Sequence, residues 1–267
     1  MDLKTLYDAI LLGIVEGLTE FLPVSSTGHL LLVQDLLGFK GPAGDVFPIV
    51  IQLGAILAVV AVYWAKFWRV LIGLPRDPDA RRFAVNVLIA FIPSAIAGAL
   101  LHDVIKSVLF SPLIVCVAMV LGGFAILAIE RLAPEPRHLD GDRLPYPTAL
   151  GVGLCQLVSL IPGVSRSGAT IMGGLMLGVG RKAAAEFTFY LAIPTMLGAA
   201  VYDLYQNWSG LSLSDAEVIG VGFVVSFLAA YLVVRSFIAF ISRFGFAPFA
   251  WYRIVVGAFM LAFLLWR

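Results

Sequence analysis

Long runs of apolar residues dominate the pattern of this chain. A membrane-spanning helix needs about 20 consecutive, mostly apolar residues. Six stretches meet that length, and they cover residues 47–72, 83–101, 109–129, 186–206, 216–236 and 248–266. The pattern therefore predicts an all-α, polytopic membrane protein with six transmembrane helices.

Two further apolar regions are interrupted near their middle by residues that break helices. The first, 6–37, is broken at Pro23 and the Ser-Ser-Thr-Gly run that follows it, and the second, 146–179, is broken at IPGVSRSGAT. Each half has only about 12–17 residues, which is too short to cross a bilayer alone. Interrupted segments of this kind are typical of re-entrant pairs of half-helices that enter the membrane and return.

The two broken regions resemble each other at a constant separation. Gly13 aligns with Gly153, and the run VSSTG at 24–28 aligns with VSRSG at 164–168 without a gap. Similarity at a fixed offset indicates a duplication, with chance agreement between two Gly/Ser turns as the alternative.

The duplication would divide one membrane domain, residues 1–267, into repeats at 1–132 and 146–267. Each repeat would hold one broken pair and three spans. Because three is odd, the second repeat starts on the opposite side of the membrane. We therefore expect an inverted repeat with two re-entrant helix pairs that meet near the midplane.

The basic residues concentrate on one side of this six-span topology. Cytoplasmic loops of membrane proteins carry an excess of Lys and Arg. One side receives Lys66, Arg69, Arg76, Arg81, Arg82, Arg131, Arg137, Arg143, Arg181, Lys182, Arg235 and Arg243. The other side receives Lys4, Lys40, Lys106 and Arg267. We expect the first side to be cytoplasmic, so that both termini and the opening of the first broken pair face outward.

Composition supports the assignment to membrane proteins and argues against a nucleic-acid partner. The chain is 61% hydrophobic and 13% charged, with a mean hydropathy of +0.98, whereas soluble domains are about 45–50% apolar and about 25% charged. A net charge of +1 gives no basic field, so no nucleic-acid partner is expected. Cys116 and Cys155 suggest no disulfide framework or zinc motif. Frequent Gly and Ala in the spans permit close helix packing, which allows a homodimer without establishing one.

Two acidic residues precede the first break. Glu16 and Glu20 are four residues apart and so share one face of a helix. Two carboxylates in a low dielectric repel each other, so either one takes up a proton or a cation lies between them. Mg²⁺ or Ca²⁺ would suit carboxylate oxygens. The alternative is a wet helix end with two solvated acids, but the apolar neighbours favour a metal site.

Hydroxyl groups and a histidine follow the same break. Pro23 cannot continue the helix, so Ser25, Ser26 and Thr27 begin the next half-helix and His29 falls in its first turn. Capping is the ordinary role for at least one of the hydroxyls. A helix N-terminus also binds phosphate through its free N–H groups and its dipole. His29 lies close in sequence to these groups, which favours a reactive role.

The second break carries a positive charge. Arg166 stands between Ser165 and Ser167 at the start of another half-helix. An arginine at membrane depth is costly unless it meets a partner, and its planar fork suits a phosphate oxyanion. A structural ion pair with Glu16 or Glu20 is the alternative. Together the two breaks predict an intramembrane site for a lipid phosphate or pyrophosphate.

The two motifs EGLTEFLPVSSTGHL and PGVSRSGAT closely resemble those of the undecaprenyl-pyrophosphate phosphatase family, also called the bacitracin-resistance protein family. The resemblance extends over essentially the whole chain. It implies an enzyme of the bacterial plasma membrane, and the orientation expected from the basic residues would make its active site face the periplasm. Such an enzyme hydrolyses undecaprenyl pyrophosphate to the monophosphate and inorganic phosphate, which recycles the carrier for peptidoglycan synthesis. It also implies divalent-metal dependence and bacitracin resistance.

The resemblance assigns roles to particular residues. The acidic motif of the family falls on Glu16 and Glu20, which would bind Mg²⁺ or Ca²⁺. Its other two motifs fall on Ser25, Ser26, Thr27 and His29, and on Ser165, Arg166 and Ser167. We expect Ser26 to be the nucleophile, His29 a proton shuttle or orienting group, and the remaining hydroxyls and Arg166 to bind phosphate. Attack by water or by His29 stays open, and a lipid-phosphate transporter is the rival function.

Overall fold

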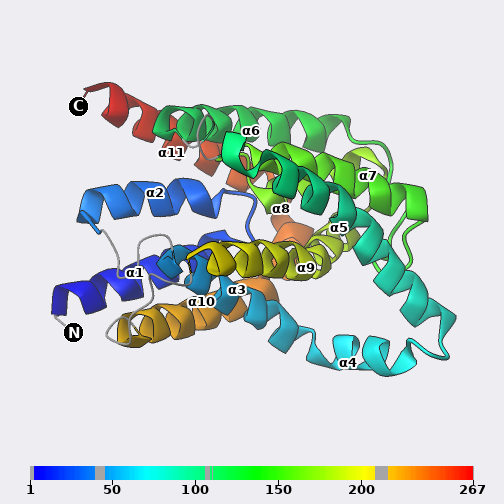
Figure 1. Ribbon diagram of the computed structural model, residues 1–267. Coiled ribbons are helices and arrows are strands. Elements are labelled where there is room, and N and C mark those ends of the chain that lie inside the picture. Colours follow the sequence, from blue (N-terminus) through cyan, green and yellow to red (C-terminus); the bar gives the residue numbers. More distant parts are fainter. Residues whose placement is uncertain (1–2, 40–45, 106–108, 110, 208–215, 267) are drawn as a thin grey trace.

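The computed structural model describes residues 3–39, 46–105, 109, 111–207 and 216–266, so Lys40, Lys106 and Arg267 lie outside the described residues. Within these ranges the chain is almost wholly helical (Figure 1). The helices are α1 Leu3–Thr19, α2 Ser26–Leu37, α3 Val46–Val62, α4 Trp64–Gly73, α5 Pro78–Val104, α6 Pro112–Leu132, α7 Tyr146–Gln156, the 3₁₀ helix η2 Leu157–Leu160, α8 Arg166–Met176, α9 Arg181–Asn207, α10 Ala216–Phe244 and α11 Ala247–Trp266. The predicted all-α membrane fold is confirmed.

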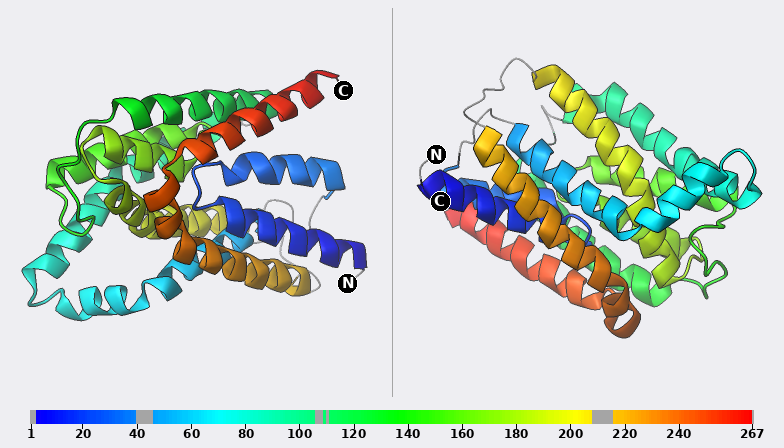
Figure 2. Two further views of the ribbon diagram at one scale, coloured as in Figure 1. Left: turned by 180° about the vertical axis from the view of Figure 1, so that it is seen from behind. Right: turned by 90° about the horizontal axis from the view of Figure 1, so that it is seen from below.

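Both interrupted regions are broken where the sequence indicates. The first pair, α1 and α2, enters from the end of the molecule that carries both termini and turns back near the middle (Figures 1 and 2). The second pair, α7–η2 and α8, enters from the opposite end. The two turns touch, because the Ser167 hydroxyl donates to the backbone carbonyls of Leu22 at 2.7 Å and Glu20 at 3.3 Å.

Among the residues that the structure describes, five helices are long and apolar enough to cross a membrane: α5, α6, α9, α10 and α11. The predicted sixth span, 47–72, is not one straight helix, because α3 and α4 meet at an angle of 74°. The bend follows from contacts that α4 makes at the end of the bundle. Lys66 pairs with Asp142 and lies over the rings of Phe83 and Tyr190. These contacts turn α4 across the bundle end instead of letting it continue along α3.

The packing of the helices relates the two halves of the chain. In the first half α1 packs against α10, and its counterpart α7 packs against α5. Likewise α3 packs against α10, and α9 packs against α5. An inverted repeat would produce this exchange of partners, because α5 and α10 occupy equivalent places in the two halves. The duplication and the repeat boundaries themselves stay predictions.

Helix α9 forms the centre of the bundle. In the most apolar window of each candidate span, 56% of α9 is buried, against 17–33% in the other four. The other helices turn large apolar side chains outward, among them Leu88, Leu121, Leu232 and Phe259. An outer surface of this kind is what contact with lipid tails requires. The fold is therefore that of a polytopic membrane protein.

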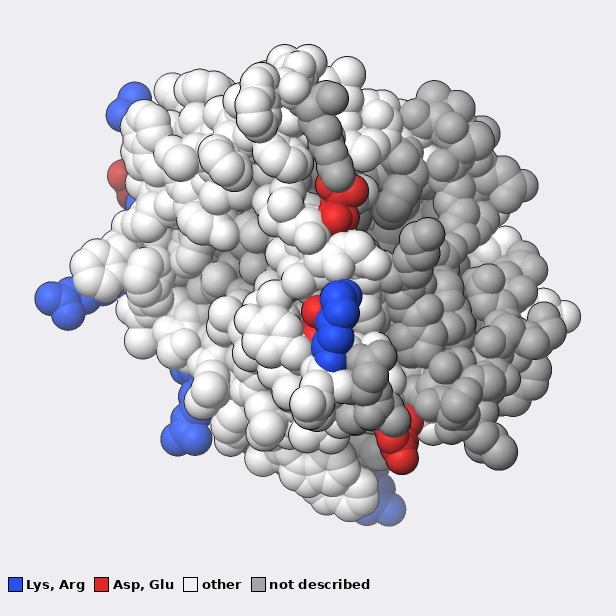
Figure 3. All heavy atoms as spheres, turned by 90° about the vertical axis from the view of Figure 1, so that its left-hand side faces the viewer, with Lys and Arg blue, Asp and Glu red and all other residues white. Residues whose placement is uncertain are grey.

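Charged side chains join the helices at the end opposite the termini. Arg181 pairs with Glu130 at 3.0 Å, and Arg143 pairs with Asp79 at 2.5 Å. Figure 3 looks onto the other end, where the visible part of the described surface is mostly uncharged. The charged end is the one that we expect to be cytoplasmic, and the mostly uncharged end is the one that we expect to face outward. The assignment of the two sides remains a prediction.

Candidate active site

The two turns are built in the same way around a strained serine. Ser25 and Ser165 have φ angles of 71° and 76°, and no other described residue except glycine has a positive φ. Each serine caps the half-helix that follows, because its hydroxyl accepts the backbone N–H of Gly28 at 3.4 Å or Gly168 at 3.1 Å. A left-handed backbone at a residue other than glycine costs about 1–3 kcal/mol. Strain of this kind persists only where the surrounding structure holds it.

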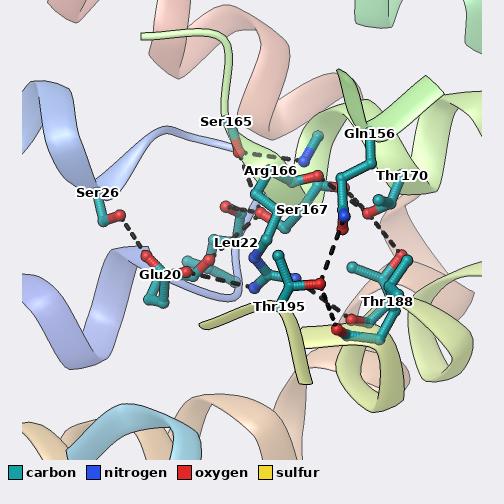
Figure 4. Close-up of polar contacts among 12 residues, drawn as sticks. Glu20, Leu22, Ser26, Gln156, Ser165, Arg166, Ser167, Thr170, Thr188 and Thr195 are labelled. Carbon is teal, nitrogen blue, oxygen red and sulfur yellow. Dashed lines mark hydrogen bonds and ion pairs between the residues drawn. The ribbon is translucent and has the colours of Figure 1, made fainter. Parts of the chain in front are cut away.

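A carboxylate from the first turn joins a hydroxyl to the guanidinium of the second turn. The Nη2 of Arg166 donates to Glu20 Oε1 at 3.3 Å, and the Ser26 hydroxyl donates to Glu20 Oε2 (Figure 4). All three side chains are largely buried. The structure thus brings together Glu20, Ser26 and Arg166, which come from opposite halves of the chain.

Two buried polar atoms beside this group have no hydrogen-bond partner among the described residues. They are Nε of Arg166 and Oε1 of Glu16. Arg166 uses Nη1 on the backbone carbonyl of Thr188, at 3.3 Å. Its unpaired Nε is therefore a donor available to an anion, and the unpaired oxygen of Glu16 is an acceptor available to a cation. Glu16 itself is not among the residues that line the cavity described next.

A cavity of about 180 Å³ opens beside these groups. Six of the predicted site residues line it: Glu20, Ser25, Ser26, Thr27, Ser165 and Arg166. Its wall also contains Pro162 and Gly163, which open the second motif, and five residues that the sequence analysis missed, namely Gln52, Ser159, Thr195, Met196 and Ala199. Gln52 carried a usable signal, because a polar residue within an apolar span is commonly functional.

His29 lies outside this cavity lining. Its Nδ1 is 2.7 Å from the carbonyl oxygen of Ser25, and its Nε2 is 2.7 Å from the hydroxyl of Tyr252, on whose ring it stacks. A carbonyl can only accept, so Nδ1 carries the proton and a neutral ring accepts the Tyr252 proton at Nε2. The structure therefore places His29 where it holds the first turn. A role as proton shuttle stays a prediction.

Ser167 also lies outside the cavity lining. Its hydroxyl donates to the carbonyl of Leu22 and is 3.0 Å from the Ser165 hydroxyl, which must then be the donor of that pair. Ser167 thus joins one turn to the other. Its predicted phosphate contact has no counterpart among its described contacts.

The predicted metal ligands are two carboxylates, those of Glu16 and Glu20. No group of three or more His, Cys, Asp or Glu side chains suited to a metal ion occurs among the residues that the structure describes. Glu16 and Glu20 offer carboxylate oxygens, and one oxygen of Glu16 is buried and unpaired. Magnesium commonly takes one or two carboxylates and completes its shell with water and substrate phosphates. The two glutamates fit such a cation.

Comparison with known proteins gives the family. Residues 9–259 match the family described as bacitracin resistance protein BacA. The chain belongs to the BacA family.

Curated relatives match along nearly their whole length. Undecaprenyl-diphosphatase 2 of Paramagnetospirillum magneticum is 54% identical over 97% of this chain and 99% of its own. Undecaprenyl-diphosphatase 1 of Agrobacterium fabrum is 52% identical over 98% of each chain. The undecaprenyl-diphosphatase of Sphingopyxis alaskensis is 52% identical over 100% of this chain and 99% of its own. The buried site of this BacA family member therefore lies in a chain that is similar throughout to enzymes acting on a lipid diphosphate.

Proposed function

We propose that this protein is an undecaprenyl-diphosphatase of the bacterial inner membrane, hydrolysing undecaprenyl diphosphate to undecaprenyl phosphate and inorganic phosphate. The observation that carries the proposal is the buried contact of Ser26 and Arg166 with the two oxygens of Glu20. This arrangement offers a nucleophile, a base and a phosphate-binding cation in one cavity. The full-length similarity to undecaprenyl-diphosphatases supplies the lipid substrate.

The geometry supports a mechanism in which Glu20 activates Ser26. The Ser26 hydroxyl already donates to the carboxylate, so Glu20 can take the proton as Oγ attacks the terminal phosphorus. A bond forms between Oγ and phosphorus, and the bridging P–O bond breaks as undecaprenyl phosphate leaves with the electron pair. Water then hydrolyses the phosphoserine, which releases inorganic phosphate and restores the serine.

Arg166 would bind the phosphoryl oxygens as their charge shifts. Its Nε is unpaired, and it lies at the N-terminus of α8, whose dipole also favours an anion. His29 would orient the first turn through the Ser25 carbonyl. Glu16 and Glu20 would hold Mg²⁺ or Ca²⁺, which supplies charge neutralisation and polarisation of the phosphoryl oxygens when bound.

Localisation and sidedness belong to the same proposal. The first pair of half-helices enters from the end that carries both termini, and the basic loops lie at the other end. With the basic loops in the cytoplasm, the opening of the first pair faces the periplasm. The substrate headgroup would then enter from the outer leaflet.

Phosphate release from undecaprenyl diphosphate by the purified protein in detergent tests this function. We expect release that stops on addition of a chelator and returns with Mg²⁺ or Ca²⁺. Ser26→Ala should abolish release because it removes the nucleophile, and a radiolabelled phosphoryl group should be trapped on Ser26 in the unaltered chain. Ser159→Ala is the matched control, because Ser159 lines the cavity but donates to the Gln156 carbonyl.

Three outcomes would contradict the proposal, two of them concerning the nucleophile and one the phosphatase function. Undiminished release by Ser26→Ala excludes Ser26 as the nucleophile, and a transient label on His29 reassigns that role. A chain that binds the lipid but releases no phosphate in detergent fits a transporter and not a phosphatase.

A further inference from the structure

Arg253 is a wholly buried arginine of α11 to which the mechanism above gives no role. It has 0% exposure and no carboxylate within ion-pair distance among the described residues. Its guanidinium donates to five backbone carbonyls: from Nε to Met119 (3.2 Å), from Nη1 to Pro23 (3.1 Å) and Val164 (2.9 Å), and from Nη2 to Ala118 (3.2 Å) and Gly163 (2.9 Å). An arginine has five N–H donors, so each of them is used.

The five acceptors belong to three separate parts of the fold. Pro23 lies in the first turn, two residues before the strained Ser25. Gly163 and Val164 lie in the second turn, directly before the strained Ser165. The other two carbonyls come from the middle of α6. One planar group therefore binds both broken turns at once and connects them to a membrane-spanning helix.

The neighbouring helix leaves room for this group. A Cβ atom on Gly122 of α6 would overlap the guanidinium of Arg253. One helical turn further along α11, a Cβ on Gly257 would meet Met119 and Val120 at 3.0 Å. Because the Met119 carbonyl also accepts from Arg253, Gly257 belongs to the surroundings of the arginine. Gly220 of α10, where a Cβ would meet no atom within 4 Å, lies outside them.

We infer that Arg253 is a positioning residue that holds the two turns in register, so that Ser26 and Glu20 of one face Arg166 of the other. The inference rests on the proposed function, because that reaction needs groups from both turns at one phosphorus. A displacement of reacting groups by about 1 Å can cost about 100-fold in rate. Lysine cannot replace the arginine, since its three donors on a compact ammonium do not span five carbonyls in one plane.

A merely structural role makes a different prediction. If Arg253 only joins α11 to α6, its loss should loosen those two helices or lower the amount of folded protein. If it aligns the turns, its loss should loosen both turns together and leave the helices intact. The backbone amides of the turns report this directly, because hydrogen exchange measures local opening without any substrate.

The experiment compares Arg253→Lys and Gly122→Ala with Gly220→Ala as the control, because a Cβ on Gly220 would meet no atom within 4 Å. Hydrogen exchange of the full chain in detergent is followed by mass spectrometry over residues 20–30 and 160–170 and along α6 and α11. In the first two variants we expect exchange in both turns to rise about tenfold while α6 and α11 keep their protection. We also expect kcat to fall at least about tenfold with a smaller change in KM. Gly220→Ala should leave both turns unchanged.

Wild-type exchange in both turns, faster exchange in only one turn, or equal loosening of α6 and α11 would overturn the inference. If Arg253→Lys does not insert, Gly122→Ala carries the test with the arginine still present. The exchange measurement needs no activity, so absence of phosphatase activity in the unaltered chain would refute the proposed function and leave the alignment of the turns to be decided by exchange alone.

Discussion

A single carboxylate organises the chemistry of the site at the scale of residues. One oxygen of Glu20 receives the Ser26 hydroxyl and the other receives Arg166. Arg166 pairs with the base through Nη2, and its buried Nε has no hydrogen-bond partner among the described residues, so the proposed function assigns this donor to the substrate. Burial strengthens these charge-assisted contacts, since water does not compete for them. Arg166 can therefore form the ion pair with Glu20 that the sequence suggested and can also bind phosphate.

Replacing Arg166 by lysine tests the importance of the planar fork. Lysine keeps the charge and can retain a contact with Glu20, but it lacks the planar guanidinium that donates to Glu20 and to the phosphate at the same time. We expect kcat for phosphate release to fall by about 10²–10³-fold, the usual cost of one lost donor to the transition state. Arg181→Lys is the matched control, because Arg181 pairs with Glu130 far along the fold and is half exposed. A rate within a few-fold of the unaltered chain would show that charge alone suffices.

At the scale of elements, glycines let the half-helix α1 lie close to a membrane-spanning helix. A Cβ on Gly13 would come within 2.7 Å of the Gly222 carbonyl oxygen, and one on Gly17 within 2.5 Å of the Ser226 carbonyl oxygen. Small residues four apart are a common means of close helix approach in membranes. This contact fixes α1, the helix that directly precedes Glu20, against α10.

Gly17→Ala should consequently destabilise the fold. Overpacking of a close contact costs about 1–3 kcal/mol, which should appear as a lower melting temperature in detergent. Gly220→Ala on α10 is the matched control, since a Cβ there meets no atom within 4 Å. We expect that control to melt at or slightly above the temperature of the unaltered chain, because alanine favours helix more than glycine does. Equal melting of both variants would contradict the close approach.

At the scale of the whole molecule, the site exists because two broken helix pairs enter from opposite ends. Neither pair contains a complete site, since Ser26 and Glu20 come from one and Arg166 from the other. Helix α11 adds a contact to each turn through Tyr252 and Arg253. The outward-facing apolar residues keep this polar centre inside a lipid-facing shell.

The sidedness of this arrangement can be measured with cysteines at exposed positions. Leu3 lies at the end with the termini and Leu139 lies in the linker between the halves, and both are more than 70% exposed, at 85% and 74%. In intact cells we expect a membrane-impermeant maleimide to label Leu3→Cys and not Leu139→Cys, because the basic loops face the cytoplasm. Labelling of both after the membrane is permeabilised is the control. The reverse pattern in intact cells would invert the proposed orientation.

The sequence by itself determined the membrane class, the two broken helix pairs and six of the residues that line the cavity. Those features depend on local properties, namely the length of an apolar run and the residues that stop a helix. The tertiary structure alone decided three others. The bend after α3 depends on Lys66 meeting Asp142, Phe83 and Tyr190. The direction of the His29 ring depends on Tyr252, 223 positions away.

The third feature that only the tertiary structure decided is the set of contacts that Arg253 makes. Arg253 was not among the predicted site residues, although an arginine within the apolar run 248–266 is a signal for a buried partner. Its acceptors were not visible, because they are backbone carbonyls of three distant segments and any residue type supplies a carbonyl. Side-chain patterns report which groups are buried. Which groups meet is set by the packing of helices far apart in the chain, and that packing places the acids, the serine and the arginine around one cavity.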